Sequence, residues 1–381
     1  MGASTEIPLV DHHCHGIFPG QPEDGFERWI SESDRRSPDF DHLDATPLGM
    51  AIRAWCSPLL DLEPGASREE YVARRAEIAP EELNARLMRA AGVAELLVDT
   101  GITSLDLTPP DELAELAGAE GHEVVRIEEV AERALERSSS VAEFRQEFET
   151  ALADRADSAV GLKTIVAYRT GLVVPDRPPE TAVADRAIER ALGQAGRARI
   201  DDPDLLHHGI WVGVELARAH RLPIQLHTGL GDTDVDISLA DPGLLTPFIR
   251  ATDGLGVNLT LLHCYPYHRT AGYLAAMYPN VYFDLGLSLN HAAGGARTVM
   301  AEAMEMAPFA KQLYASDAIG IAELHHLGAL LFRRSLDAVL DGWIGDGLIR
   351  TADAERIAAA IASGNARRLY GLEGRSGTRP E

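Results

Sequence analysis

The stretch LVDHHCHG, residues 9–16, places an aspartate, three histidines and a cysteine at the end of an apolar run. The IPLV run that leads into it predicts a short buried strand, and alternate side chains of a strand point to the same side. Asp11, His13 and His15 should therefore form one row, with His12 and Cys14 in the other. We expect His12 to hydrogen-bond to a neighbouring helix and Cys14 to be a small packing residue.

The rest of the chain repeats the pattern of that first strand. Short apolar runs alternate with amphipathic segments of helix length, which implies parallel strands joined by crossovers. Eight such units predict an α/β fold of the (β/α)8 TIM-barrel type. The seven further strands are expected at residues 94–99, 122–127, 159–168, 222–227, 257–263, 280–286 and 311–317.

The domain organisation follows from where this rhythm is interrupted. Residues 16–90 carry loop signals and helical stretches, and we interpret them as a helical and loop insertion after the first strand. The tail from Ala322 has the apolar spacing of closing helices, so residues 1–381 are expected to form a single barrel domain. A doubly wound sheet is the alternative, but GLGDTD at 229–234 lacks the third glycine of a dinucleotide fingerprint and does not open an apolar helix.

Composition restricts the partners. The net charge is −24, from 35 basic and 59 acidic side chains, and such a surface repels phosphate backbones and anionic lipid. Three widely separated cysteines indicate no disulfide framework, and no signal peptide or membrane-spanning run occurs. We therefore expect a cytoplasmic protein that acts on a small molecule, with no nucleic-acid or membrane partner. A homodimer is the commonest assembly for such a chain.

Chemistry-bearing residues stand at the ends of the predicted strands, where the catalytic residues of a barrel lie. His227 ends the fifth strand, His263 the sixth and Asp317 the eighth, and only the row with His13 and His15 can converge with them. Imidazole nitrogen and carboxylate oxygen are ligands for a catalytic divalent metal, with zinc favoured and manganese or iron accepted by the same set. A packed histidine pair is the alternative for His13 and His15 alone.

These motifs resemble a known family. DHHCH, HTG, LLHCYP and YASD, in this order at strand ends, are similar to the amidohydrolase superfamily of metal-dependent barrels. The longer runs GLKTIVAYRTGL, IQLHTGLGD, LLHCYPYHRTAGYLA, NVYFDLGL and YASDAIG resemble the amidohydrolase domain that precedes a glutamine-synthetase-like domain in FluG and nodulin-type proteins. The resemblance covers nearly the whole chain and is weakest over 16–90. We expect the amidohydrolase part to stand here without the synthetase-like domain.

The resemblance implies roles for the strand-end residues. His13 and His15 would bind the metal, His227 and Asp317 would complete the ligand set, and His263 would bind a second metal or polarise the substrate carbonyl. One or two ions are compatible with this set. A bound metal lowers the pKa of a water to about 7 and polarises a carbonyl. Asp317 would then take the proton and pass it to the leaving amine.

Lysine usage draws attention to the fourth strand. Only Lys163 and Lys311 are lysines among the 35 basic residues, and Lys163 lies within the apolar fourth strand. In binuclear relatives a lysine of this strand carries CO2 as a carbamate that bridges two metals, which arginine cannot do. A Lys163 that pairs with an acid or reaches a substrate carboxylate is the alternative.

Other residues near the predicted barrel mouth are candidates for the substrate. Arg169 follows the fourth strand together with Tyr168, and a fixed guanidinium suits a substrate carboxylate. His268 follows the sixth strand in the same way. A surface salt bridge for Arg169 and a solvated loop for His268 are the alternatives. Asp99 and Asp284 end two further strands and are expected to hydrogen-bond to ligands.

The sequence thus predicts a metal-dependent hydrolase that cleaves a C–N bond of a small, carboxylate-bearing amide. The same site could instead serve a decarboxylase or an isomerase of a small organic acid, and release of CO2 rather than an amine would separate the first of these from hydrolysis. A non-catalytic barrel with a regulatory or assembly role is a third hypothesis, whose expected mark would be a missing ligand.

Overall fold

The computed structural model describes residues 2–4, 7–35, 39–194 and 199–374. The chain divides into two compact units, which are described one at a time. The first unit comprises Met1–Val98, Ser104–His122 and Asp284–Arg368. The second comprises Asp99–Thr103, Glu123–Phe283 and Leu369–Glu381.

The first unit is built around the strand that opens the chain. Strand β1 (Leu9–Cys14) pairs in parallel with β2 (Val93–Asp99), and every residue of β1 is buried. Their register is irregular between Asp11 and Cys14, where two residues of β1 lack a regular partner. A bulge of this kind redirects side chains, so strict alternation ends at this point of the strand.

Residues 311–317, predicted as the eighth strand, do not form a regular strand. The segment nevertheless lies along β1, where the eighth strand was expected. The amide of His12 donates to the carbonyl of Tyr314 (3.1 Å), and the amide of Asp317 donates to the carbonyl of His13 (3.0 Å). Between them the Ser316 amide donates to the side chain of Asp11 (3.0 Å) instead of to a backbone carbonyl. This side-chain acceptor interrupts the ladder, and the segment runs along β1 as extended chain.

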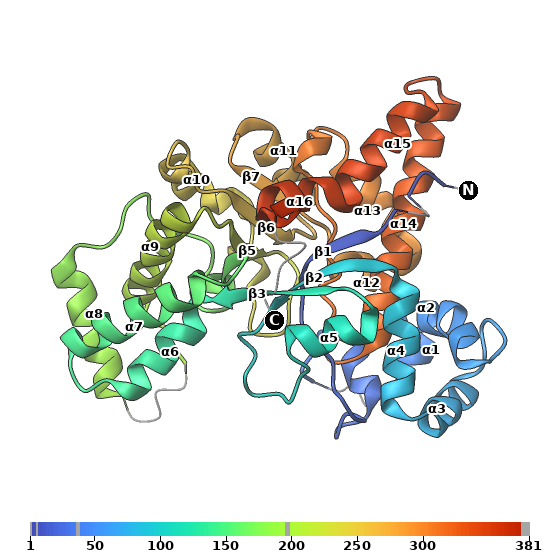
Figure 1. Ribbon diagram of the computed structural model, residues 1–381, viewed down its shortest axis with the longest axis horizontal. Helices are drawn as coiled ribbons and strands as arrows, with labels where there is room; N and C mark the ends of the chain where they lie inside the picture. Colours follow the sequence, from blue (N-terminus) through green and yellow to red (C-terminus); the bar gives the residue numbers. More distant parts are fainter. Residues whose placement is uncertain (1, 5–6, 36–38, 195–198, 375–381) are drawn as a thin grey trace. The chain divides into compact units, whose positions relative to one another are not determined.

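Helices surround these strands, and those between β1 and β2 gather in one group (Figure 1). Local signals set their ends: the Thr46 hydroxyl accepts from the Gly49 amide, and Ser67 forms a capping box with Glu70. The α-helices are α1 (His42–Ala45), α2 (Pro47–Trp55), α3 (Arg68–Glu77), α4 (Pro80–Ala91), α5 (Pro110–Ala117), α12 (Ser288–Ala292), α13 (Ala296–Ala303), α14 (Ala322–Gly345) and α15 (Thr351–Ala359), followed along the chain by α16 (Asn365–Tyr370). Shorter helical segments are η1 (Phe26–Ile30), η2 (Ser57–Leu60), η6 (Ala293–Gly295), η7 (Phe309–Lys311) and the π-helical η8 (Ala360–Gly364).

The second unit continues the parallel strands. They follow one another in chain order and are β3 (Glu120–Arg126), β4 (Gly161–Thr164), β5 (Ile224–Thr228), β6 (Leu259–His263) and β7 (Val281–Phe283). All residues of β4, β5 and β6 are buried, as expected for parallel strands covered on both faces. The register places Lys163 beside Arg126 and His263 beside Thr228.

Helices of the second unit pack closely on these strands. At Gly213 of α9, a Cβ would lie 2.6 Å from the end of the Ile127 side chain on α6, which would have to shift to admit it. The α-helices are α6 (Ile127–Arg137), α7 (Val141–Ala156), α8 (Thr181–Gly193), α9 (Pro203–His220), α10 (Thr246–Thr252) and α11 (His268–Met277). The shorter segments are η3 (Val166–Tyr168), η4 (Ile237–Leu239), η5 (Pro242–Leu245) and η9 (Leu372–Gly374).

The α/β architecture with parallel strands is confirmed, and seven of the eight predicted strands are present as strands. Helices α1 to α4 occupy the predicted helical region after β1. Its status as an insertion and the expectation of one domain over residues 1–381 stay predictions. Within the described ranges, no helix combines the length and the apolar character needed to cross a membrane.

A buried ion pair fixes α3 to the beginning of α14. Arg75 Nε donates to Glu323 Oε1 (2.7 Å), and Tyr71 donates its hydroxyl to the same oxygen (3.3 Å). Arg75 also donates to Gln21 Oε1 (2.6 Å), and its guanidinium lies over the ring of Phe26. Glu323 is fully buried, so its charge depends on this partner.

Replacing Arg75 by methionine should lower the free energy of unfolding by about 3–5 kcal/mol, because Glu323 is left charged and buried without its cation. The matched control is Arg86→Met on α4, whose partners Asp61 and Glu82 are exposed and whose loss should change stability little. Urea unfolding followed by circular dichroism measures both. Equal losses in the two variants would contradict a special role for the buried pair.

Candidate metal centre

In the first unit, two histidines and a carboxylate point their donor atoms at one place. His13 Nε2 lies 3.0 Å and His15 Nε2 3.5 Å from the same oxygen, Oδ1 of Asp317. The two imidazole rings are 5.2 Å apart and nearly perpendicular. All three side chains are buried, and the backbone bond from Asp317 to His13 fixes the carboxylate beside the strand.

This donor set fits a divalent metal. Bond lengths near 2.1 Å put two tetrahedral ligands about 3.4 Å apart, which is close to the two distances observed. Two neutral imidazoles protonated on Nε2 could make both contacts as hydrogen bonds, so the distances are compatible with a metal without requiring one. Nitrogen, nitrogen and carboxylate oxygen suit zinc, manganese and iron alike.

The backbone at two predicted metal-site residues is strained. Asp317 has a φ of 51° and His263 a φ of 67°, which is the left-handed region that residues other than glycine rarely adopt. Cys264 continues this conformation at 60°. Such backbone costs about 1–3 kcal/mol per residue and clusters at functional sites, where it aims a side chain that a regular strand would point elsewhere.

In the second unit, two more predicted ligands are neighbours at adjacent strand ends. The rings of His227, from β5, and His263, which ends β6, are 4.6 Å apart. The ring of Tyr168 lies 4.4 Å from that of His227. The structure therefore brings together His227, His263 and Tyr168, which the sequence assigned to metal, catalysis and substrate.

Lys163 is a buried lysine with an acid partner. Its Nζ lies 3.7 Å from Asp99 Oδ2, and the same oxygen accepts from Nη2 of Arg126 (2.7 Å). The Gly101 amide donates to the other oxygen of Asp99 (2.9 Å). Asp99 therefore contacts the predicted lysine, as expected of a supporting residue. Arg126 was not predicted, and its only signal is a charge at the end of the apolar strand HEVVR.

Arg169 and His268, which were predicted to bind the substrate, lie in different surroundings. Arg169 donates through Nη2 to Glu132 (3.0 Å), while its buried Nε and Nη1 have no hydrogen-bond partner among the described residues. Burial lowers the pKa of Arg169, and the nearby charges of Arg199 and Arg126 act in the same direction. His268, at the start of α11, stacks on Tyr265 with the rings nearly parallel.

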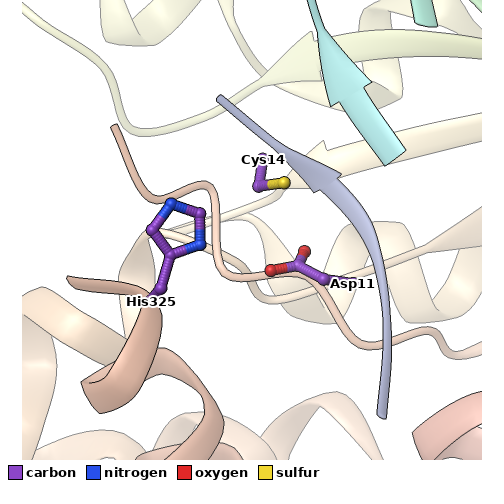
Figure 2. A group of neighbouring side chains, drawn as sticks. All are labelled: Asp11, Cys14 and His325. Atoms are coloured by element: carbon purple, nitrogen blue, oxygen red, sulfur yellow. The ribbon is translucent and has the colours of Figure 1, made fainter. Parts of the chain in front are cut away.

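Two expectations for β1 need correction. His12 does not reach a helix: its Nε2 donates to Asp284 Oδ2 (3.0 Å), just beyond β7 in the chain. Asp11 does not share the row of His13, because the irregular register groups it with Cys14 and with His325 of α14 (Figure 2). Burial raises the pKa of Asp11 to about 7.

The neighbours His12 and His13 allow a sharp test of the ligand assignment. His13→Asn should weaken zinc binding by more than about 100-fold, because a ligand is lost and not merely a supporting bond. His12→Asn removes the bond to Asp284 and should keep affinity within about tenfold of the unchanged chain. Titration against a chromogenic chelator measures both, with circular dichroism to check folding. Equal weakening in the two variants would rule out the assignment.

Solved structures of known proteins resemble this chain in fold. A solved structure of a proposed metal-dependent hydrolase from Lactobacillus casei ATCC 334 is 28% identical, with a TM-score of 0.85 over 98% of each chain. Two sugar-acid isomerases share the fold at 14% identity: uronate isomerase from Thermotoga maritima, with a TM-score of 0.64 over 97% of this chain and 95% of that one, and glucuronate isomerase from Caulobacter crescentus, with 0.66 over 100% and 93%.

A curated relative and a family model complete the comparison. Protein FluG of Emericella nidulans is 28% identical over 404 residues, which cover 96% of this chain and 46% of that protein. The chain therefore spans about half the length of this relative. The family model described as amidohydrolase matches residues 10–372. Nearly the whole chain is thus accounted for, and it belongs to the amidohydrolase family.

Proposed function

We propose that the chain is a metal-dependent hydrolase that cleaves the C–N bond of a small, carboxylate-bearing amide. The observation that carries this proposal is the convergence of His13 and His15 on Oδ1 of Asp317. Membership of the amidohydrolase family supports the reaction class. The carboxyl ends of parallel strands carry the active sites of barrels, and Lys163 and His227 lie toward these ends of β4 and β5.

The proposed metal is zinc, with manganese or iron as alternatives for the same ligands, and one or two ions are compatible with them. When bound, a divalent metal acidifies a water molecule and polarises the carbonyl to be attacked. His13, His15, His227 and Asp317 would hold it. The chain's own residues must then position the amide and move the protons.

Asp317 is proposed as the proton carrier. Its Oδ1 faces the two histidines, and the same carboxylate would accept the proton of the attacking water and return it to the leaving nitrogen. His263 is proposed to stabilise the negative charge that develops on the carbonyl oxygen. Its neighbour His227 lies 4.6 Å away, centroid to centroid, so both rings can serve one substrate.

Arg169 is proposed to bind the substrate carboxylate, with Tyr168 and His268 beside the bound substrate. The buried Nε and Nη1 of Arg169 have no acceptor among the described residues, and a buried guanidinium without acceptors is costly. A carboxylate supplies acceptors and charge together. The backbone carbonyl of Tyr168 accepts from Arg199, which ties this loop to a second cation.

Lys163 has two proposed roles that exclude each other. As a carbamate it would bridge two metals, which requires a neutral amine to react with CO2. As an ammonium it would stay paired with Asp99 in a centre with one metal. Arg126 lies closer to the same oxygen of Asp99, so two cations share one carboxylate there.

An isomerase or decarboxylase of a small organic acid is the second candidate. It would use the same ligands, and the two solved isomerases named above share this fold, although at 14% identity they support the fold alone. The products separate the candidates: an amine or ammonia from hydrolysis, CO2 from decarboxylation, and neither from isomerisation.

Asp317→Asn should lower kcat for amide hydrolysis by about 10²–10⁴-fold, because an amide cannot carry the proton. The assay measures amine release from a panel of small amides that bear a carboxylate. Ser335→Ala, a buried change on α14 away from the strand end, serves as control and should keep kcat. Turnover that Asp317→Asn leaves undiminished would exclude the proposed proton transfer.

The two lysines give a direct test for the carbamate. Zinc-loaded protein in 13C-bicarbonate should show one carbamate carbon signal, which Lys163→Ala abolishes and Lys311→Ala retains. Metal content should fall by one or two ions per chain in Lys163→Ala. A metal content that is unchanged in that variant, together with no carbamate signal, would establish the ammonium role instead.

A further inference from the structure

A second group of donor atoms lies inside the first unit and takes no part in the proposed reaction. One donor atom each of Asp11, Cys14 and His325 lies within 4.8 Å of the others. Figure 2 shows the side chains of Asp11 and Cys14, from β1, to the right of the ring of His325, from α14. All three side chains are at most 1% exposed.

Polar atoms in this group lack the partners that burial demands. The Oδ1 atom of Asp11 accepts from the Ser316 amide, but its Oδ2 has no hydrogen-bond partner in the described part of the chain. The hydroxyl of Tyr314, which faces Gly328 of the same helix, has none either. Among the described residues no arginine or lysine forms an ion pair with Asp11. An unpaired carboxylate oxygen in a protein interior costs several kcal/mol unless a cation or donor meets it.

We propose that Asp11, Cys14 and His325 bind a zinc ion, separate from the catalytic metal. Thiolate, imidazole and carboxylate are all zinc ligands, and the thiolate disfavours magnesium and calcium. On binding, the thiol of Cys14 loses its proton to solvent and the S–Zn bond forms. Two anionic ligands and one neutral imidazole then balance the charge of the ion, so the interior holds no net charge.

The irregular register of β1 is what makes this site available. In a regular strand Asp11 and Cys14 would face opposite sides, and the bulge between them brings both toward α14. The ion would link β1 to α14 close to His13 and His15 in the chain. The site stands on its own observations and does not depend on the proposed reaction.

Cobalt(II) is the probe that separates this site from the catalytic one. The full chain, produced in zinc-free medium with cobalt, should show a near-ultraviolet thiolate-to-cobalt charge-transfer band, because the proposed catalytic ligands include no sulfur. Cys14→Ser should abolish the band and lower the cobalt content by one ion per chain, as measured by mass spectrometry. Cys56→Ser, a buried cysteine beside Tyr71, is the matched control and should retain both.

Two further variants keep the outcomes distinct. His13→Asn with His15→Asn should retain the band, so that failure of the catalytic assignment leaves this site standing. His325→Gln should lose the charge-transfer band, so the test does not depend on whether Cys14→Ser folds. Wild-type protein that binds no cobalt, or binds it without the band, would overturn the proposal, as would a band that survives Cys14→Ser.

Discussion

The hydrogen bond from the Asp317 amide to the His13 carbonyl joins strand β1, near the start of the chain, to the segment that carries Asp317. It does so at the candidate metal centre. It sets one carboxylate oxygen facing two imidazole nitrogens, one from His13 on β1 and one from His15 just after the strand. The neighbouring bond from Ser316 to the Asp11 side chain prevents a regular ladder at this point. The segment can therefore turn through the left-handed conformation of Asp317 directly after it.

Most of this framework could be predicted from the sequence, because parallel strands that are buried on both faces have continuous apolar sequences. The apolar runs around Leu226 and Leu261 are such cases. Each run is followed by a histidine, His227 or His263, that was predicted to be functional. The rings of these two histidines are neighbours in the structure. The prediction that His13 and His15 act together came from their spacing, and the prediction that Asp317 approaches them came from the order of the strands. The structure brings the three together, and their role as ligands stays a prediction.

What the sequence could not provide depends on local departures from regular geometry. Strict alternation put Asp11 with His13, and nothing in DHHCH indicates the bulge that turns it toward Cys14. Arg126 was overlooked because a charge at a strand end has no spacing signature of its own. The contact of Lys163 with Asp99 depends on the register between neighbouring strands, which periodicity does not determine.

The buried pair of Arg75 and Glu323 has a consequence for how the chain responds to its metal. Glu323 begins the helix that follows Asp317 in the chain, so the docking of α3 and the position of a metal ligand are parts of one equilibrium. Coupling between two such events is reciprocal. The helical region after β1 is thus joined, through Glu323 at the start of α14, to the segment that carries Asp317.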